Sequence, residues 1–483
     1  MADALLLSAD EIRALGGRVL ELVAEYYGSL NTRPVLEPAS SELLRATVAE
    51  PLPREGAAFD DLLTTLRDVV IRYSRHNGHP RFFGYVASPG TPIASLGSLL
   101  GAAMAVNVTA WRSAPVATEL EHVTVGWLKE MLGYPASAMG LLVSGGSMAN
   151  FSGLAAAVAA KAPGNVLRDG LIGGPRLRVY VSEESHFSVA KAAGMMGIGE
   201  ANVRQIATDE AFAMNVAELR HAIAEDIAAG YLPICVVANA GATATGAFDS
   251  ISGVAAVARE HNLWLHVDAA YGGFAALAPS SKHLFRDIAL ADSVALDPHK
   301  WLYQPIGCGC ILYKDAAAAR AAFSHSAEYT RTIGLERDEA FAFWDYGPEL
   351  TRPFRALDLW LAIKFIGVDR LAEAVEENIQ CARYFAELVA GTDDFEMLAP
   401  VGLSVFCFRY VPRNFAGDLD VLNEKILVDL QHSGSSYVSN AKLRGKFALR
   451  GCVLNYRTTR GDMERLLADV RESGLRLSSR SEL

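Results

Sequence analysis

Short apolar runs alternate with Ala-rich segments of helical character through the middle of the chain. These runs are residues 140–144, 177–182, 232–239, 263–268 and 293–297. Strands of a parallel sheet are buried on both faces, so they read as continuous apolar runs connected by helices. The pattern therefore predicts an α/β fold with a mostly parallel central sheet between about residues 86 and 355.

The first 85 residues have a helical pattern instead. An apolar residue recurs at steps of three and four positions, at Ile12, Leu15, Val19, Leu22 and Tyr26. Ser8 and Glu11 have the spacing of a capping box, so we expect a helix to begin there. Residues 32–55 hold four of the 19 prolines, and we expect this stretch to be extended. Residues 1–85 are thus predicted to form an N-terminal helical segment.

The pattern changes again after about residue 355. Two long helical patterns come first, and strand patterns follow at residues 404–410 and 447–454. We therefore expect a small C-terminal α/β domain over residues 356–483, after a large domain over residues 86–355.

The composition excludes several classes of partner. The 483 residues include 44 basic and 55 acidic ones, a net charge of −11. Nucleic acids and anionic membranes require a basic face, so neither is expected as a partner. The longest weakly polar stretch is well short of the ~20 residues of a membrane span, and no export signal is evident. The six cysteines lack metal-ligand spacing, so we expect a cytoplasmic protein without a metal.

Lys300 and Asp268 are the first candidates for chemistry. Lys300 follows an apolar run, at the edge where open α/β sheets bind ligands, and lysines there commonly form Schiff bases with carbonyl groups. Asp268 ends the preceding apolar run, one strand–helix–strand unit earlier. Pyridoxal phosphate (PLP) requires such a pair, because lysine holds its aldehyde and aspartate pairs with its ring nitrogen. The same local sequences also fit a different interpretation, in which Lys300 is a surface lysine after a turn and Asp268 is a turn or cap residue.

Two further segments fit a flat, phosphorylated cofactor. Gly145, Gly146 and Ser147 lie between a predicted strand and a predicted helix, where backbone N–H groups can cradle a phosphate. The segment is neither GxGxxG nor GxxxxGK[ST], which removes the main support for a dinucleotide or a nucleoside triphosphate. His186 lies at a strand–helix junction and could stack on a ring, although it could also simply cap the helix.

Nine landmarks in a fixed order resemble a known family. They are residues 79–84, 115–121, the Gly145–Ser147 turn, the His186 segment, 241–249, 265–272, the Lys300 loop, 352–357 and 449–459. Together they resemble the group II PLP-dependent amino-acid decarboxylases of the aromatic-L-amino-acid decarboxylase type, over about residues 7–468. The resemblance implies the PLP-dependent transferase fold of type I, like that of aspartate aminotransferase, with a seven-stranded type of sheet. It also implies a homodimer with its active site at the subunit interface and residues 1–85 as a dimerisation arm.

The resemblance also assigns roles to individual residues. It implies Lys300 for the covalent bond to PLP, Asp268 for the ring nitrogen, His186 for the ring face, Thr243 and Ala270 for the lining, and Gly146, Ser147 and His299 for the phosphate. Tyr85 and Ser88 would lie on the substrate side. The stretch 324–344 matches the loop that closes over the site and supplies a catalytic group.

The chain departs from the family pattern at two places. Asp297 stands where the family usually has asparagine, and its carboxylate should repel a phosphate unless it faces away or pairs with a base. Phe343 stands where the family has its catalytic tyrosine, which is expected to protonate the carbanion after carbon dioxide leaves. Phenylalanine there accompanies an oxidative, aldehyde-forming outcome in some members. Tyr346 is close enough in sequence to replace the missing proton donor.

The substrate is inferred from three positions. Asn107 and Thr109 lie where animal aromatic decarboxylases have larger apolar side chains, and Thr351 lies where plant relatives have a small or hydroxyl residue. These residues favour tyrosine or DOPA over tryptophan, although they could also only fill space. The main prediction is decarboxylation of an aromatic L-amino acid to its amine and carbon dioxide. The alternatives are an oxidative aldehyde synthase acting on the same substrates and, less favoured, an NAD-type oxidoreductase or a non-catalytic PLP-fold protein.

Overall fold

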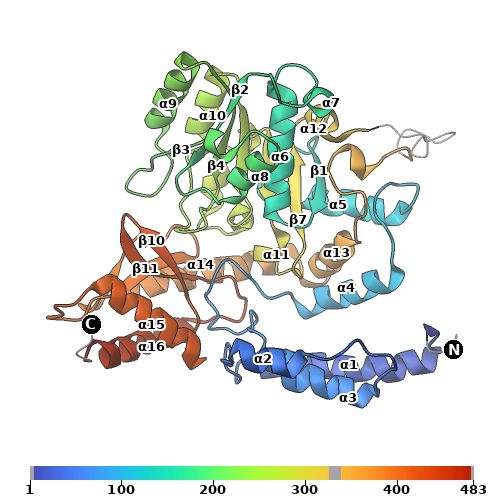
Figure 1. Ribbon diagram of the computed structural model, residues 1–483, viewed down its shortest axis with the longest axis vertical. Coiled ribbons are helices and arrows are strands. Elements are labelled where there is room, and N and C mark those ends of the chain that lie inside the picture. The colour runs from blue at the N-terminus through green and yellow to red at the C-terminus, as the bar shows by residue number, and fades with distance from the viewer. Residues whose placement is uncertain (1–4, 326–338, 480–483) are drawn as a thin grey trace.

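A seven-stranded sheet forms the centre of the molecule in a computed structural model that describes residues 5–325 and 339–479 (Figure 1). Its spatial order is β1-β7-β6-β5-β4-β2-β3. The strands are β1 (Met139–Val143), β2 (Arg176–Ser182), β3 (Val203–Ile206), β4 (Tyr231–Asn239), β5 (Trp264–Ala269), β6 (Ser293–Leu296) and β7 (Gly309–Tyr313). Only β7 runs antiparallel to its neighbours, so the prediction of a mostly parallel sheet is confirmed.

Helices cover both faces of this sheet. They include α5 (Pro115–Leu132), α6 (Gly146–Lys161), α8 (Ser188–Met195), α9 (Val216–Ala228), α10 (Ile251–Glu260) and α12 (Ala316–Phe323). The connections through α6 and α8 cross the sheet in one direction, and those through α9 and α10 cross it in the other. Because such crossovers are right-handed, the two pairs lie on opposite faces. The strands are therefore buried on both sides, as their apolar sequences require.

The topology brings several chain segments to one edge of the sheet. Asp268 near the end of β5 lies beside Asn239 at the end of β4 and beside Ala295 of β6. The short helix α11 (Pro298–Trp301) begins immediately after β6, and α6 begins just after β1. The candidate residues around Asp268, Lys300 and Gly146 consequently meet at the carboxyl ends of the parallel strands.

A smaller antiparallel sheet follows toward the C-terminus, with the order β10-β11-β9-β8. Its strands are β8 (Phe395–Met397), β9 (Val405–Tyr410), β10 (Ser439–Leu443) and β11 (Lys446–Cys452). The helices packed on it are α14 (Val368–Ala390), α15 (Leu419–Ser433) and α16 (Arg460–Ser478), and α13 (Arg355–Ile366) precedes them. A second hydrophobic core lies between this sheet and its helices.

The N-terminal helices lie at the same end of the molecule as α15 and α16, away from the large sheet (Figure 1). They are α1 (Ala9–Ser29), α2 (Ser41–Val48) and α3 (Phe59–Thr65), followed by a π-helical turn (Leu66–Ile71) and, further on, α4 (Pro92–Met104). The expected capping box at Ser8 and Glu11 is confirmed. The expectation that residues 32–55 are wholly extended is wrong, because Ser40 caps α2 within them.

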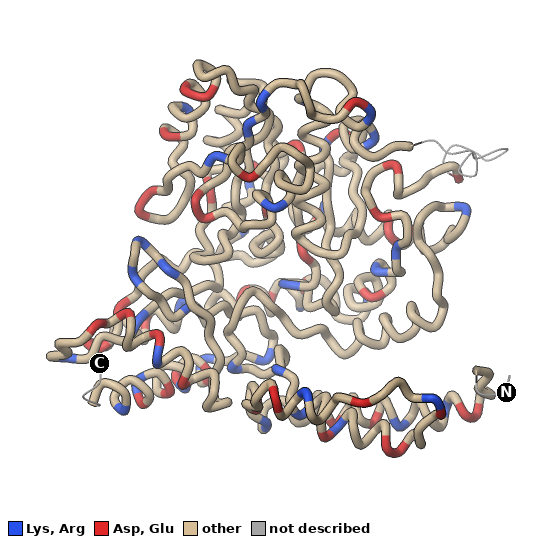
Figure 2. Tube along the Cα trace, viewed as in Figure 1, with Lys and Arg blue, Asp and Glu red and all other residues tan. Residues whose placement is uncertain are grey.

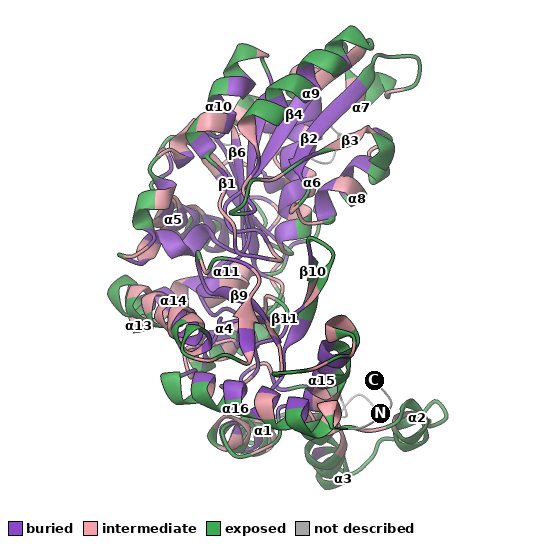
Figure 3. Ribbon diagram, turned by 90° about the vertical axis from the view of Figure 1, so that its left-hand side faces the viewer, coloured by how far each residue is buried: buried purple, intermediate pink, exposed green. Residues whose placement is uncertain are grey.

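Much of the surface of α1–α3 is exposed, apolar positions included (Figure 3). Of the predicted apolar stripe, Leu22 is buried, whereas the side chains of Ile12 and Val19 face solvent. Acidic and basic residues are interspersed along these helices (Figure 2), and Arg18 pairs with Asp60 to join α1 to α3. The exposed apolar positions indicate a surface that another chain can cover.

A buried ion pair fixes the helix α5 against the sheet. The Arg352 guanidinium pairs with the Glu121 carboxylate of α5, and both side chains are only 1% exposed. Arg352 Nη1 donates to Val108 O (2.7 Å) and Nη2 to Leu142 O (2.7 Å), while Glu121 Oε1 accepts from Leu142 N (2.8 Å). The pair therefore joins β1, α5 and the segment before the C-terminal helices.

The six cysteines are all buried thiols, and none of them forms a disulfide. None of the helices within residues 5–325 and 339–479 is both long enough and apolar enough to cross a membrane.

Replacing Glu121 with alanine should strongly destabilise the protein, because it leaves the Arg352 guanidinium buried without its carboxylate. We expect the free energy of unfolding to fall by about 3–5 kcal/mol, measured by urea denaturation. The matched control is Glu119→Ala, which removes an exposed carboxylate from the same helix and should cost at most about 1 kcal/mol. Equal losses in the two variants would contradict the importance of the buried pair.

His79 should make stability depend on pH. Burial lowers the pKa of His79 to about 4, and its Nδ1 accepts a hydrogen bond from Arg81 N (3.0 Å). In the unfolded chain this histidine is protonated below about pH 6.5, whereas in the folded chain it is protonated only below about pH 4. The free energy of unfolding therefore falls as the pH falls through this range. We expect His79 to contribute a loss of about 2 kcal/mol between pH 7.5 and pH 5.

His79→Asn keeps an acceptor near the Nδ1 position and cannot titrate, so unfolding measured at both pH values should lack that loss. The exposed His221, changed to asparagine, is the control. If the free energy of unfolding of His79→Asn depends on pH as it does in the unaltered protein, His79 is not the source of the loss.

Candidate active site

A cavity of about 910 Å³ opens at the carboxyl ends of the parallel strands. Its lining includes most of the cofactor residues expected from the sequence, namely Tyr85, Gly146, Ser147, His186, Thr243, Asp268, Ala270, His299 and Lys300. Strands β4 and β5, helices α6 and α11, and strands β10 and β11 of the small sheet supply parts of its wall. The cavity therefore lies between the two sheets.

The Asp268 carboxylate is buried at the floor of this cavity and fully hydrogen-bonded. Asn150 of α6 donates from Nδ2 to Asp268 Oδ2 (2.8 Å), and Ala270 N donates to Asp268 Oδ1 (3.1 Å). A buried carboxylate without such donors would be costly, so these two bonds hold Asp268 in one orientation.

Asn150 is itself held by a chain of buried polar groups. Its Oδ1 contacts His266 Nε2 (2.9 Å), and His266 Nδ1 contacts Ser293 Oγ (2.7 Å), which also accepts from Trp264 Nε1 (2.8 Å). Burial lowers the pKa of His266 to about 4, so the ring is neutral, with Nε2 donating and Nδ1 accepting. This arrangement leaves the Asn150 amide group free to donate toward Asp268.

The same asparagine orients His186. Asn150 Nδ2 also donates to Ser188 Oγ (3.0 Å), and Ser188 Oγ lies 2.8 Å from His186 Nδ1. Since Ser188 N also points at Nδ1 (3.3 Å), that nitrogen is the acceptor and Nε2 carries the proton. Burial lowers the pKa of His186 below its ordinary value, which favours the neutral ring.

Close backbone approach shapes the phosphate side of the cavity. Gly309 of β7 passes so near Gly145 that a Cβ on Gly309 would lie 2.5 Å from Gly145 Cα. A Cβ on Gly146 would lie 2.8 Å from the Ala270 methyl carbon, so only glycine leaves the start of α6 open at this point. The exposed N–H groups at the start of a 16-residue helix, with the Ser147 hydroxyl beside them, suit an anion. The donors, the lysine and the buried carboxylate together fit PLP.

The lysine loop is fixed by its neighbours. His299 Nδ1 contacts Cys308 O (2.8 Å), and Ser88 Oγ donates to His299 O (2.8 Å). Ser88 is thus a buried support of the loop, and it is not among the residues that line the cavity. Lys300 Nζ lies 2.9 Å from Asp297 Oδ2, so the unusual Asp297 pairs with a base.

Arg450 of β11 joins the small sheet to the cavity. Its Nε donates to Thr243 O (3.0 Å), and its Nη1 donates to Tyr85 O (2.8 Å). Arg450 lies within the landmark at residues 449–459 and Asn150 lies three residues after the Gly145–Ser147 turn, but the sequence assigns neither of them a role. Nothing in the local pattern shows that an asparagine inside a helix or an arginine inside a strand reaches a shared cavity.

Other candidates lie away from this cavity. Asn107 Oδ1 accepts from Arg352 N (2.9 Å), Thr109 O accepts from Phe343 N (2.9 Å), and Thr351 is exposed. Phe343 is fully buried beneath the Arg352 guanidinium, whose carbon lies 4.0 Å from the ring centre. Within one chain, these residues therefore form a separate cluster.

Tyr346 also lies outside the cavity lining, with its ring stacked on Phe341 at 5.5 Å. Of the loop expected to close over the site, residues 324–344, the part 326–338 lies outside the described residues.

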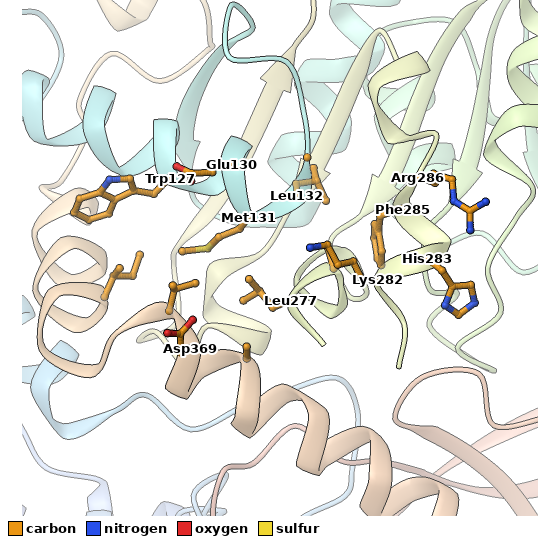
Figure 4. Close-up of a pocket in the computed structure, with 15 residues that line it drawn as sticks. Trp127, Glu130, Met131, Leu132, Leu277, Lys282, His283, Phe285, Arg286 and Asp369 are labelled. Atoms are coloured by element: carbon orange, nitrogen blue, oxygen red, sulfur yellow. The ribbon is translucent and has the colours of Figure 1, made fainter. Parts of the chain in front are cut away.

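A second cavity, of about 820 Å³, contains none of the candidate residues (Figure 4). Trp127, Met131 and Phe285 form its apolar wall, and Lys282 and Arg286 approach from the same side as Phe285. No group of three or more His, Cys, Asp or Glu side chains within the described ranges is placed to hold a metal ion.

Comparison with known proteins identifies the family. The pyridoxal-dependent decarboxylase conserved domain matches residues 42–411. An aromatic-L-amino-acid decarboxylase of Bacillus atrophaeus is 34% identical over 98% of this chain and 97% of its own length. A phenylacetaldehyde synthase of Petunia hybrida is 30% identical over 93% of this chain and 91% of its own length.

Solved structures agree with this result. The crystal structure of Oryza sativa TDC with PLP and tryptamine superposes with a TM-score of 0.92 at 28% identity, covering 98% of this chain and 99% of that one. The fold is that of the type I PLP-dependent decarboxylases, as the sequence landmarks implied. The chain therefore belongs to the pyridoxal-dependent decarboxylase family and is a PLP-dependent carboxy-lyase of amino-acid metabolism.

Proposed function

We propose that this protein decarboxylates an aromatic L-amino acid, tyrosine or DOPA in preference to tryptophan, and releases the amine and carbon dioxide. The observation that carries the proposal is the meeting of Lys300, Asp268 and His186 in one cavity, above the open start of α6. Nothing else in the described part of the chain combines an amine, a buried carboxylate and a neutral imidazole with an anion cradle.

Each of these residues has a distinct task. Lys300 holds the cofactor covalently, and Gly146, Ser147 and His299 bind its phosphate. Asp268, held by Asn150, pairs with the ring nitrogen and favours its protonated form, since an opposite charge stabilises a cation. When bound, PLP supplies the sink for the electron pair that carbon dioxide leaves behind.

His186 and the residues around it hold the cofactor ring in place. The neutral imidazole presents a flat face, and the bonds through Ser188 prevent it from rotating. Thr243 and Ala270 line the remaining sides of the cavity. Because the positions of these groups are set before any ligand enters, little freedom is lost on binding.

We propose further that two chains form the complete site. Ile306 lines the cavity although 79% of its side chain is exposed, and Leu350 is 64% exposed. The apolar side chains along α1 and α4 are exposed as well. A homodimer would cover these surfaces, with residues 1–85 as the dimerisation arm, and would bring the Asn107 and Phe343 cluster of one subunit toward the cavity of its partner.

The preference for a phenolic substrate rests on the polarity of that cluster. Thr109 Oγ1 is buried with no hydrogen-bond partner among the described residues, and Thr351 is exposed at the surface. Tyr85, half exposed at the mouth of the cavity, can pack on an aromatic side chain. Polar groups of this kind suit a ring that carries a hydroxyl.

The second candidate function is oxidative aldehyde formation, and one observation favours it. Phe343 replaces the proton donor expected at its position and is locked in the core. If no acid protonated the carbon that lost carbon dioxide, dioxygen could oxidise it and be reduced to hydrogen peroxide, and water could then release the aldehyde and ammonia. The similar Petunia hybrida protein is a phenylacetaldehyde synthase.

Lys300→Ala should abolish the covalent bond to PLP and nearly all turnover while leaving the fold intact. The measurements are the visible absorption band, the bond trapped by borohydride, and amine production. Lys442→Ala is the matched control, because Lys442 lines the same cavity on β10 and should not remove the trapped bond. Full activity in Lys300→Ala would end the proposal.

Tyr346→Phe should raise the aldehyde fraction, and Phe343→Tyr should lower it. We expect the unaltered protein to make mainly amine, with some aldehyde, because Tyr346 supplies the proton, and a positioned acid contributes about 10²–10⁴-fold. Amine, aldehyde, ammonia and peroxide are quantified for tyrosine, DOPA and tryptophan.

Tyr384→Phe, which removes an exposed hydroxyl on α14, is the control. If Tyr346→Phe leaves the rate and the product ratio unchanged, Tyr346 is not the donor. Aldehyde and peroxide in place of amine from the unaltered protein would overturn the decarboxylation proposal.

A further inference from the structure

Asp297 places a second buried carboxylate at the phosphate side of the cavity. Its side chain is 3% exposed, and it follows β6 directly, just before α11. A Cβ on Gly146 would lie 2.8 Å from Asp297 Oδ2, so this carboxylate faces the start of α6. The position expected for the cofactor phosphate thus has a carboxylate in its wall.

The two oxygens of Asp297 differ in their surroundings. Oδ2 lies 2.9 Å from Lys300 Nζ and 3.7 Å from His299 Nε2. Oδ1 is buried and has no hydrogen-bond partner among the described residues. An ionised carboxylate can only accept hydrogen bonds, so Oδ1 lacks a donor in this state.

Binding of PLP removes the partner that Oδ2 now has. If PLP condensed with the Lys300 amine and one water left, Lys300 would no longer face Asp297 as a free ammonium. A phosphate monoester is a dianion above about pH 7 and, like an ionised carboxylate, offers only acceptor atoms. Two acceptors side by side repel each other unless one proton is placed between them.

We propose that Asp297 makes cofactor loading a proton-coupled step. One proton, taken from solvent, binds to Asp297 as PLP binds, and the neutral acid then donates a hydrogen bond to the phosphate. In the ligand-free protein Asp297 Oδ2 pairs with Lys300 Nζ at 2.9 Å. The inference rests on the proposed roles of Lys300 and Gly146 and adds a specific role for the carboxylate.

Other titratable groups face Asp297 from three parts of the fold. Lys300 and His299 face it from α11, His186 faces it from the segment before α8, and Cys308 and Cys310 face it from the region of β7. Burial raises the pKa of both thiols, so they stay protonated and uncharged. From α6, Gly146 lies against Asp297 and has no titratable side chain.

The test counts protons on binding. Cofactor-free protein is titrated calorimetrically with PLP at about pH 8 in two buffers that differ in ionisation enthalpy, which gives the number of protons taken up. The same titration with 5′-deoxypyridoxal, which keeps the aldehyde but lacks the phosphate, subtracts the proton chemistry of Lys300. We expect binding of PLP to be accompanied by uptake of about one proton more than binding of 5′-deoxypyridoxal, because only PLP brings a dianion to Asp297.

Asp297→Asn should remove this difference and bind PLP about tenfold more tightly at pH 8, since the amide can donate without a proton from solvent. Asp297 makes no side-chain capping bond, so the amide should not disturb α11. Asp315→Asn is the control, because Asp315 also precedes a helix after a strand but is exposed.

Two results would overturn the proposal. One is an equal proton difference in Asp297→Asn and in the unaltered protein; the other is tighter binding by the variant without any change in proton number. Failure of the proposed function would look different, since the unaltered protein would then show neither a visible band with PLP nor a bond trapped by borohydride.

Discussion

The burial of the Asp268 carboxylate is the constraint on which the site depends. A charge removed from water must be met by fixed donors, and here Asn150 and the Ala270 N–H group meet it. His266 Nε2 donates to Asn150 Oδ1, which orients the Asn150 Nδ2 group toward Asp268. One polar network therefore reaches from the core of the sheet to the His186 ring, and a change at any point in it alters the cavity.

Two buried carboxylates of the cavity are in opposite situations. Each oxygen of Asp268 accepts a hydrogen bond, from Asn150 Nδ2 and from Ala270 N. Asp297 has one oxygen paired with Lys300 and one oxygen without a donor. The first arrangement suits a permanent structural charge, and the second suits a group whose state changes with the ligand. The start of α6 lies close to both carboxylates, because a Cβ on Gly146 would lie 2.8 Å from the Ala270 methyl carbon and 2.8 Å from Asp297 Oδ2.

The sequence predicted the large sheet well because its strands are apolar throughout and meet helices at regular intervals. Its five apolar runs do not include β3 and β7, since β3 is half exposed and only the four-residue helix α11 separates β7 from β6. Lys300 and Asp268 could be paired because their distance along the chain fits one crossover. The partners of Asp268 could not, because Asn150 comes from a helix far away in sequence. The boundaries near residues 85 and 355 stay predictions.

The buried cysteines make this protein convenient for spectroscopy. Burial raises the pKa of all six thiols, and thiolates are the form that reacts with alkylating reagents. A cysteine introduced on the surface would consequently be the one reactive thiol of the folded chain. A fluorophore or spin label could be attached at exposed positions such as Asp315 without first replacing any native residue. Distances across the cavity could then be followed in solution as the cofactor and substrate bind.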